Sequence, residues 1–179
     1  MTAAEFARKI RNREKCVGYW VVLDAPVATE RLARLGYDYV ALDGQHGLIG
    51  NAGLLSNLMA VDAGGRSVGL VRVESGDPAV IGRALDFGAG GVYVGPSDLC
   101  LAVGGRFPND PEVAGVFEAA LERIRVTAEK AGIAAGIHNA SGEQAARRLA
   151  EGYTFATVSS DLLHLEQAAA AHLRAARGQ

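Results

Sequence analysis

The sequence predicts an α/β fold with about six parallel strands in one domain over residues 1–179. Three observations support this prediction. Short runs rich in β-branched and aromatic residues alternate with longer segments of helical periodicity. A unit of helix, glycine, strand and polar tip recurs, as in residues 34–43 and 149–161. No low-complexity linker divides the chain. Such alternation is typical of a parallel sheet, either closed into a barrel or open.

The clearest strand is Tyr39–Asp43, which is followed by Gly44, Gln45, His46 and Gly47. An apolar run that stops at an acid and continues into a glycine-flanked histidine is typical of a buried parallel strand. In α/β folds, ligands bind at the carboxyl ends of such strands. The sequence therefore predicts a functional site around His46.

Helix-end signals place the other elements. Thr2 and Glu5 have the spacing of a capping box, which predicts a helix over residues 2–13. Gly132 follows a long helical segment as its cap, and Pro78 stands early in another helix, where its missing N–H costs little. We expect the other helices at residues 27–35, 52–63, 79–87, 111–130, 141–151 and 162–177, and the strands at 17–23, 39–43, 67–73, 92–94, 133–137 and 153–158.

Composition and charge exclude several classes of function. The formal net charge of −2 gives no basic surface for nucleic acid and no polybasic membrane anchor. Cys16 and Cys100 belong to no Cys/His cluster, so we expect two reduced thiols rather than a zinc site or disulfide. Residues 1–15 lack the apolar core of a signal peptide, and no stretch reaches the length of a membrane span. We therefore expect a cytoplasmic protein that acts on small molecules.

Polar residues follow most of the predicted strands, and the ends of parallel strands meet at one edge of the sheet. An acid, an imidazole and a guanidinium at this edge would form a site for a small anion with acid–base chemistry. The residues at these strand ends are Asp43, His46, Arg72, Asp98, His138 and Asp161.

Two of these residues are the strongest candidates. His46 could act as a general base near neutral pH, because its ordinary pKa is close to 7; the alternative is a loop histidine with no role. Arg72 ends an apolar strand and could clamp a carboxylate with two hydrogen bonds. Its alternative is a structural ion pair with Asp86 or Glu74.

The remaining candidates have weaker signals. Asp98 follows a Gly-Pro turn and could face a hard cation, although Pro-Ser-Asp is also a common start of a helix. Asp86 would ordinarily be a solvated surface acid. His138 lies at a strand tip, whereas His164 and His172 on the last helix are expected to pack or to lie on the surface.

Several ordered motifs resemble the HpcH/HpaI aldolase family, whose members are metal-dependent class II pyruvate aldolases. The resemblance extends through residues 135–138 and 155–161, and it covers nearly the whole chain. The motifs that carry it are residues 39–47, 71–73 with Asp77 and Pro78, 83–89 and 92–99.

The resemblance implies a (β/α)8 barrel, a TIM-barrel-like fold that often assembles into hexamers by exchange of the C-terminal helix. By this resemblance, His46 is the catalytic base and Asp86 forms a dyad with it. Arg72 holds the pyruvate oxygens and stabilises the enolate. Asp98 is one carboxylate ligand of a divalent metal, which would be Mg²⁺, Mn²⁺ or Co²⁺. The backbone of the segment Gly95, Pro96, Ser97 and Asp98 receives the substrate carboxylate.

The chain departs from the family pattern between residues 86 and 98, which are only twelve positions apart. About two β/α units are missing here, so we expect a fold shortened to about six parallel strands. Because strand number, tilt and shear are coupled in a barrel, such a sheet cannot close in the usual way. Open edges would favour a homo-oligomer, either a trimer or a hexamer. The family's second metal-ligating carboxylate has no counterpart, and Glu74 is a candidate substitute.

Two hypotheses of different classes follow for the function. The first is a lyase that cleaves a 4-hydroxy-2-oxo acid to pyruvate, or a related 2-oxo acid, and an aldehyde. The second is a truncated, inactive relative that serves as a binding or assembly subunit. A third, weaker hypothesis is a (β/α) lyase for a phosphorylated substrate, but no glycine-rich phosphate loop opens a helix.

Overall fold

The computed structural model describes residues 1–72 and 91–178. Glu74, Asp86 and the helix expected at 79–87 lie outside the described residues. The described strands are β1 (Cys16–Val21), β2 (Tyr39–Asp43), β3 (Val68–Arg72), β4 (Gly91–Val94), β5 (Ala134–Asn139) and β6 (Phe155–Ser160). The described helices are α1 (Ala3–Arg11), α2 (Pro26–Ala33), α3 (Asn51–Gly64), α5 (Pro96–Ala102), the 3₁₀ helix η1 (Pro111–Val113), α6 (Ala114–Lys130), α7 (Gly142–Glu151) and α8 (Asp161–Ala176).

The chain divides into two compact units. The first comprises Met1, Gly18–Val80 and Ser159–Gln179, and the second comprises Thr2–Val17 and Ile81–Val158. The boundary passes through β1 after Val17 and through β6 after Val158. In each unit the paired strands are parallel, as the sequence predicts.

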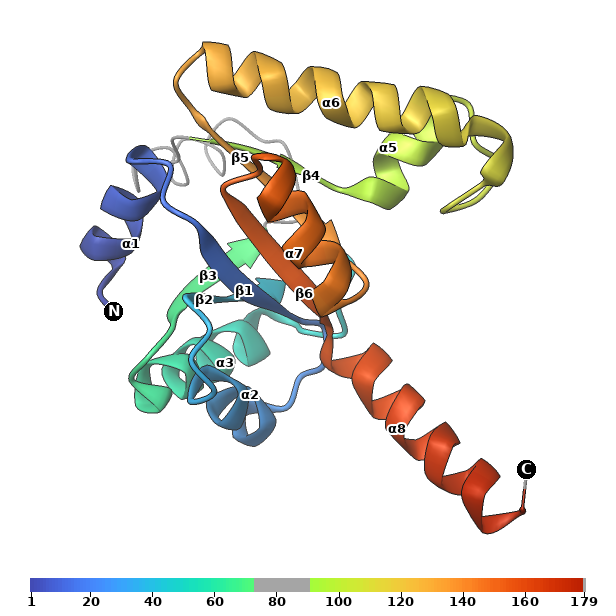
Figure 1. The fold of residues 1–179 in the computed structure, drawn as a ribbon. Helices are drawn as coiled ribbons and strands as arrows, with labels where there is room; N and C mark the ends of the chain where they lie inside the picture. The colour runs from blue at the N-terminus through green and yellow to red at the C-terminus, as the bar shows by residue number, and fades with distance from the viewer. Residues whose placement is uncertain (73–90, 179) are drawn as a thin grey trace. The chain divides into compact units, whose positions relative to one another are not determined.

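In the first unit, β2 lies between β1 and β3 (Figure 1). Every residue of β2 is buried, which explains its uninterrupted apolar sequence. Val40 and Leu42 of β2 pack with Tyr19 and Val21 of β1 in the core of this unit. Helices α2 and α3 pack side by side along these strands (Figure 1). This core fixes the ends of β2 and β3, where the predicted site begins.

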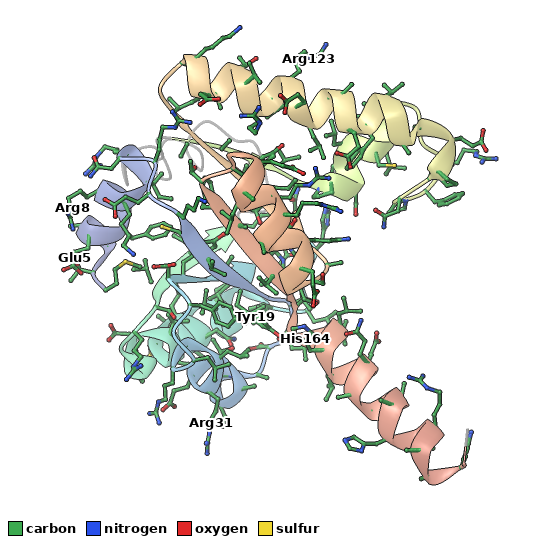
Figure 2. The ribbon with its side chains drawn as sticks, in the orientation of Figure 1. Glu5, Arg8, Tyr19, Arg31, Arg123 and His164 are labelled. Atoms are coloured by element: carbon green, nitrogen blue, oxygen red, sulfur yellow. The ribbon has the colours of Figure 1, made fainter. Side chains whose placement is uncertain are left out.

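The start of α8 is anchored to β1 in the same unit. Figure 2 shows Tyr19 of β1 beside His164 of α8, and the Tyr19 hydroxyl lies 2.6 Å from His164 Nδ1. Burial raises the pKa of Tyr19 to about 12, so the phenol stays neutral. The Asp161 carboxylate accepts hydrogen bonds from the backbone N–H groups of Val22 and Leu23. Beyond this anchor, no residue of α8 is buried.

In the second unit, β5 lies between β4 and β6. One face of these strands packs against α6: Val94 and Ile137 share a core with Leu121 and Ala128. The buried Tyr153 joins this core, and its hydroxyl donates to the backbone carbonyl of Leu121. On the opposite face, Thr157 Oγ1 lies 2.8 Å from His138 Nδ1 and forms a hydrogen bond with the Tyr93 hydroxyl.

Most expected elements are confirmed, with a few corrections. The capping box of Thr2 and Glu5 is present at α1. The segment after β4 forms the short helix α5, which begins at Pro96, in agreement with Pro-Ser-Asp as a common start of a helix. His138 lies within β5 and not after it, since the ladder with β6 continues to Asn139. Along the described parts of the chain, no helix is both long and apolar enough to span a bilayer.

Candidate functional site

Asp43, the last residue of β2, organises the turn that follows. Its side chain is only 3% exposed. The Oδ1 atom accepts hydrogen bonds from the backbone N–H groups of Gln45, at 3.0 Å, and of His46, at 2.9 Å. An aspartate that binds the backbone two and three residues later is a common way to close a turn. Asp43 therefore fixes the backbone at His46.

Arg72, the last residue of β3, forms a two-point ion pair with Asp43. The two residues are register partners in the parallel ladder. Arg72 Nε donates to Asp43 Oδ1 at 2.9 Å, and Nη2 donates to Oδ2. This fork of two parallel hydrogen bonds holds the guanidinium plane in one orientation. The structure thus shows the ion pair that the sequence left as an alternative, with Asp43 as the partner.

Trp20 of β1 completes the cluster. Its indole Nε1 donates to Asp43 Oδ2 at 3.2 Å. The Arg72 guanidinium carbon lies 5.3 Å from the centre of a Trp20 ring, a cation–π distance. Three neighbouring strands therefore each contribute one member of an Asp43–Arg72–Trp20 cluster at their carboxyl ends.

The protonation state of Asp43 follows from these contacts. Burial raises the pKa of this carboxyl, but the hydrogen bonds from Arg72, from the His46 backbone and from Trp20 outweigh burial and hold the pKa at about 2. Asp43 is therefore ionised at neutral pH and neutralises part of the Arg72 charge. It can accept no proton from a substrate near neutrality, so it is a positioning residue rather than an acid or base.

Two glycines allow the turn to pass close to the cluster. The Gly44 N–H donates to the Arg72 carbonyl at 3.0 Å. A Cβ atom on Gly47 would lie 2.2 Å from the Asp43 carbonyl oxygen, which no side chain tolerates. The sequence Gly-Gln-His-Gly after the strand is thus required by the close approach of the backbone.

Arg72 retains donors for a ligand. A guanidinium carries five N–H groups, and Asp43 uses the edge formed by Nε and Nη2. The end of the guanidinium, with Nη1 and the second hydrogen of Nη2, is the edge that a ligand would meet. The Arg72 side chain is 29% exposed, so solvent reaches it. His46 is exposed in the adjacent turn.

The predicted carboxylate-binding segment, Gly95–Asp98, belongs to the second unit. Gly95 caps α5, and Pro96 begins the helix. Ser97 and Asp98 are exposed. A Cβ on Gly95 would lie 2.6 Å from Asp98 Oδ2, so glycine leaves the space that the Asp98 carboxylate occupies.

Asp98 supplies one ligand of the type that a hard divalent cation prefers. Within residues 1–72 and 91–178, no three His, Cys, Asp or Glu side chains form a group that could hold a metal. Magnesium can bind through one or two carboxylates while it keeps several waters. Among the described residues, Asp98 is therefore a single exposed carboxylate and not a member of a three-residue group that could hold a metal.

The predicted site residues that the structure describes form two groups, one in each unit. Arg72 and the turn that carries His46 meet at Asp43 in the first unit, and Gly95–Asp98 form the start of α5 in the second. Asp86 lies outside the described residues. Asp161, expected at the site, instead binds the backbone after β1.

Asp43 is one of the polar strand ends that the sequence predicts at the site, but its bonds to the His46 backbone and to Arg72 are not part of that prediction. The spacing of Asp43 to His46 is nevertheless the signal for a turn closed by a side chain. The sequence does not indicate that Trp20 belongs to the site, because a tryptophan in an apolar strand usually belongs to the hydrophobic core.

Curated relatives match part of the chain. No family model matches it. The chain is 36% identical over 84 residues to 5-keto-4-deoxy-D-glucarate aldolase from Enterobacter sp. (strain 638), a match that covers 47% of the chain and 32% of the relative. It is 34% identical over 84 residues to the aldolase of the same name from Salmonella paratyphi A. The chain thus covers about a third of the length of these relatives.

Solved structures match over nearly the whole chain. An HpcH/HpaI aldolase/citrate lyase family protein from Burkholderia cenocepacia has a TM-score of 0.80 at 23% identity, covering 98% of this chain and 100% of that one. An HpcH/HpaI aldolase from Desulfitobacterium hafniense has a TM-score of 0.76 at 17% identity, covering 96% of each chain. The citrate synthase SbnG has a TM-score of 0.77 at 16% identity, covering 96% of this chain and 97% of that one. The resemblance read from the motifs is confirmed, and the fold is a shortened version of the HpcH/HpaI fold.

Proposed function

We propose that this chain is a shortened aldolase of the HpcH/HpaI type. It would cleave a 4-hydroxy-2-oxo acid to pyruvate, or a related 2-oxo acid, and an aldehyde. The observation that carries the proposal is the guanidinium of Arg72, held in one orientation by Asp43 and Trp20 beside the turn of His46. The aldolase relatives that match 47% of the chain support the same reaction class.

Arg72 would stabilise the negative charge that develops on the 2-oxo oxygen. When the C3–C4 bond breaks, its electron pair moves into the 2-oxo group and gives an enolate. A preorganised donor at that oxygen stabilises the transition state, because it needs no reorientation as charge develops. The Asp43 fork provides this preorganisation.

His46 would take the proton of the C4 hydroxyl as that carbon becomes the aldehyde carbonyl. A proton delivered to C3 of the enolate then yields pyruvate. Asp86, through its predicted dyad with His46, would orient the imidazole. The fixed backbone and exposure of His46 support this assignment.

Asp98 would be one ligand of the divalent metal Mg²⁺, Mn²⁺ or Co²⁺. The Gly95–Asp98 segment would hold the substrate carboxylate through the backbone N–H groups of Gly95, Ser97 and Asp98, since Pro96 has none. When bound, the metal supplies polarisation of the 2-oxo group. The exposed Asp98 carboxylate supports this role.

The alternative function is an inactive relative that binds or assembles. It is favoured by one observation: within residues 1–72 and 91–178, no three His, Cys, Asp or Glu side chains form a group that could hold a metal. Metal affinity separates the two proposals, since an inactive subunit has no need for a metal site.

We also propose a homo-oligomer, a trimer or a hexamer. The exposure of Leu165 and Leu173 on α8, a helix without buried residues, supports association, because exposed apolar side chains favour burial against a second chain. The cytoplasmic location stays a prediction.

The metal assignment predicts the behaviour of Asp98→Asn. With a 4-hydroxy-2-oxo acid as substrate, pyruvate release by the parent chain should require added Mn²⁺ or Mg²⁺. The variant should need at least about tenfold more metal for its half-maximal rate, because a neutral amide is a poorer ligand than a carboxylate. The measurement is the rate of pyruvate release as a function of metal concentration.

Glu112→Gln is the matched control, since it removes an exposed carboxylate of η1 in the same unit. Its metal requirement should equal that of the parent. If Asp98→Asn had the parent's metal requirement, Asp98 would not be a ligand.

A further inference from the structure

In the first unit, one backbone hydrogen bond joins the turn that carries His46 to the segment that follows β1. The N–H of Leu48 donates to the carbonyl of Val22 at 2.7 Å. The Leu48 side chain is 70% exposed, so its packing does not hold the backbone here. The turn is therefore held by Asp43 at its start and by Val22 at Leu48, before the buried Ile49 joins the core.

The position of Val22 depends on hydrogen bonds, because no side chain in the segment 22–25 is buried. Asp161, the first residue of α8, supplies two of them. Its Oδ1 accepts from the N–H of Val22 at 2.9 Å, and its Oδ2 accepts from the N–H of Leu23 at 3.2 Å. The Oδ1 atom also accepts from the N–H of Leu162 at 2.9 Å. One carboxylate thus holds both the segment 22–25 and the start of α8.

Asp24 holds the same segment against α3. Its Oδ1 accepts a hydrogen bond from Asn57 Nδ2 at 2.9 Å. Asn57 is fully buried and is itself fixed, because it donates to the Gly53 carbonyl and accepts from the Thr29 hydroxyl. A Cβ on Gly53 would lie 2.2 Å from Asp24 Oδ2, so glycine leaves room for this carboxylate. The segment 22–25 is therefore held by a helix on each side, α8 and α3.

We propose that Asp161 is a positioning residue that places His46 for its proton transfer. It acts through the segment 22–25, which holds the turn of His46 by the bond from Leu48. Asp24 has the same role from the side of α3. This inference rests on the proposed aldolase function. A base must lie within hydrogen-bond reach of the proton that it takes, so a displaced turn lowers the rate of that step.

Two reactions separate this role from a general loss of structure. Cleavage of a 4-hydroxy-2-oxo acid needs His46, which takes the proton of the C4 hydroxyl. Exchange of the methyl protons of pyruvate involves no C4 hydroxyl, and we assign its enolate to Arg72, which Asp43 orients. A displaced His46 should slow cleavage and spare exchange, whereas loss of the fold would slow both.

The principal test is the Asp161→Ala variant, with folding verified by circular dichroism. For cleavage of 4-hydroxy-2-oxopentanoate, measured as pyruvate release, kcat should fall about tenfold or more. Exchange of the pyruvate methyl protons in D₂O should stay within about twofold of the parent rate. The contact between Tyr19 and His164, seen in Figure 2, still anchors α8 in this variant.

Three further variants make the result specific. Ser160→Ala is the matched control, since it removes the cap on the N–H of Leu163 and keeps the Asp161 carboxylate; both rates should stay within about twofold of the parent. Asp161→Asn keeps one acceptor oxygen and should lose less cleavage activity than Asp161→Ala. Asp24→Ala removes an exposed side chain and should lower cleavage at least about threefold, again without loss of exchange.

The outcomes separate the positioning role from the aldolase proposal. Parent-like cleavage in folded Asp161→Ala and Asp24→Ala would overturn the positioning role and leave the aldolase proposal intact. Cleavage and exchange that fall in parallel would also overturn it, because the effect would not pass through His46. Absence of pyruvate exchange in the folded parent chain would overturn the aldolase proposal, and with it this inference.

Discussion

The Arg72→Ala variant is expected to exchange the methyl protons of pyruvate at least about a hundredfold more slowly than the parent chain. Among the described side chains, Arg72 is the one that we assign to the developing enolate oxygen. Its loss removes a donor that is already oriented by Asp43, and no flexible side chain replaces it without reorganisation. The exchange is followed in D₂O by the decay of the methyl signal in NMR spectra.

Two comparisons make this result specific. Arg72→Lys keeps the positive charge but loses the planar fork to Asp43, so we expect it to be slow as well. Arg31→Ala removes an exposed arginine of α2, labelled in Figure 2, and should exchange at the parent rate. Parent-like exchange by a folded Arg72→Lys variant would show that an oriented guanidinium is not needed.

The Asp43→Asn variant is expected to lower the free energy of unfolding by about 3 kcal/mol at neutral pH. Asp43 is buried and forms a two-point ion pair, and removal of one partner of such a pair leaves the other uncompensated. This loss of stability is at the lower end of the range that is usual for removing one partner of a buried ion pair, because the Arg72 side chain is 29% exposed. Urea unfolding curves measure this difference.

The difference in free energy of unfolding between the parent and Asp43→Asn should become smaller as the pH falls. The folded pKa of Asp43, about 2, is below its ordinary value of 3.8, so its ionisation stabilises the fold above about pH 4. This contribution, about 2 kcal/mol, decreases as the pH falls toward 2. The parent and the variant should therefore converge in acid. Asp62→Asn, which removes an exposed carboxylate of α3, is the control and should show no such trend. A parent–variant gap that stayed constant between pH 5 and pH 2.5 would contradict the low pKa.

Much of the fold could be predicted because its signals are local. The fully buried β2 has an uninterrupted apolar sequence, and the capping box at Thr2 and Glu5 identifies the start of α1. Both depend on residues within one element. The positions of β3 and β5 were predicted to within two residues for the same reason.

The partner of Arg72 could not be predicted in this way. The sequence suggested the nearby acids Glu74 and Asp86, whereas the structure pairs Arg72 with Asp43, 29 positions earlier. That contact is set by the register between β2 and β3, which no local pattern encodes. Trp20 joins the same cluster from a third strand, again through sheet order alone. The role of Thr157 as the hydrogen-bond partner of His138 has the same origin.

The most direct test of the aldolase proposal is metal-dependent exchange of the pyruvate methyl protons by the parent chain. Exchange requires only formation of the enolate, so it does not depend on the identity of the aldehyde. The chain should be assayed in D₂O with Mn²⁺, with Mg²⁺ and with a chelator, after its folding has been verified. We expect exchange that requires metal and stops with the chelator. A folded chain that exchanges no methyl protons at any metal concentration would contradict it and would favour the inactive relative.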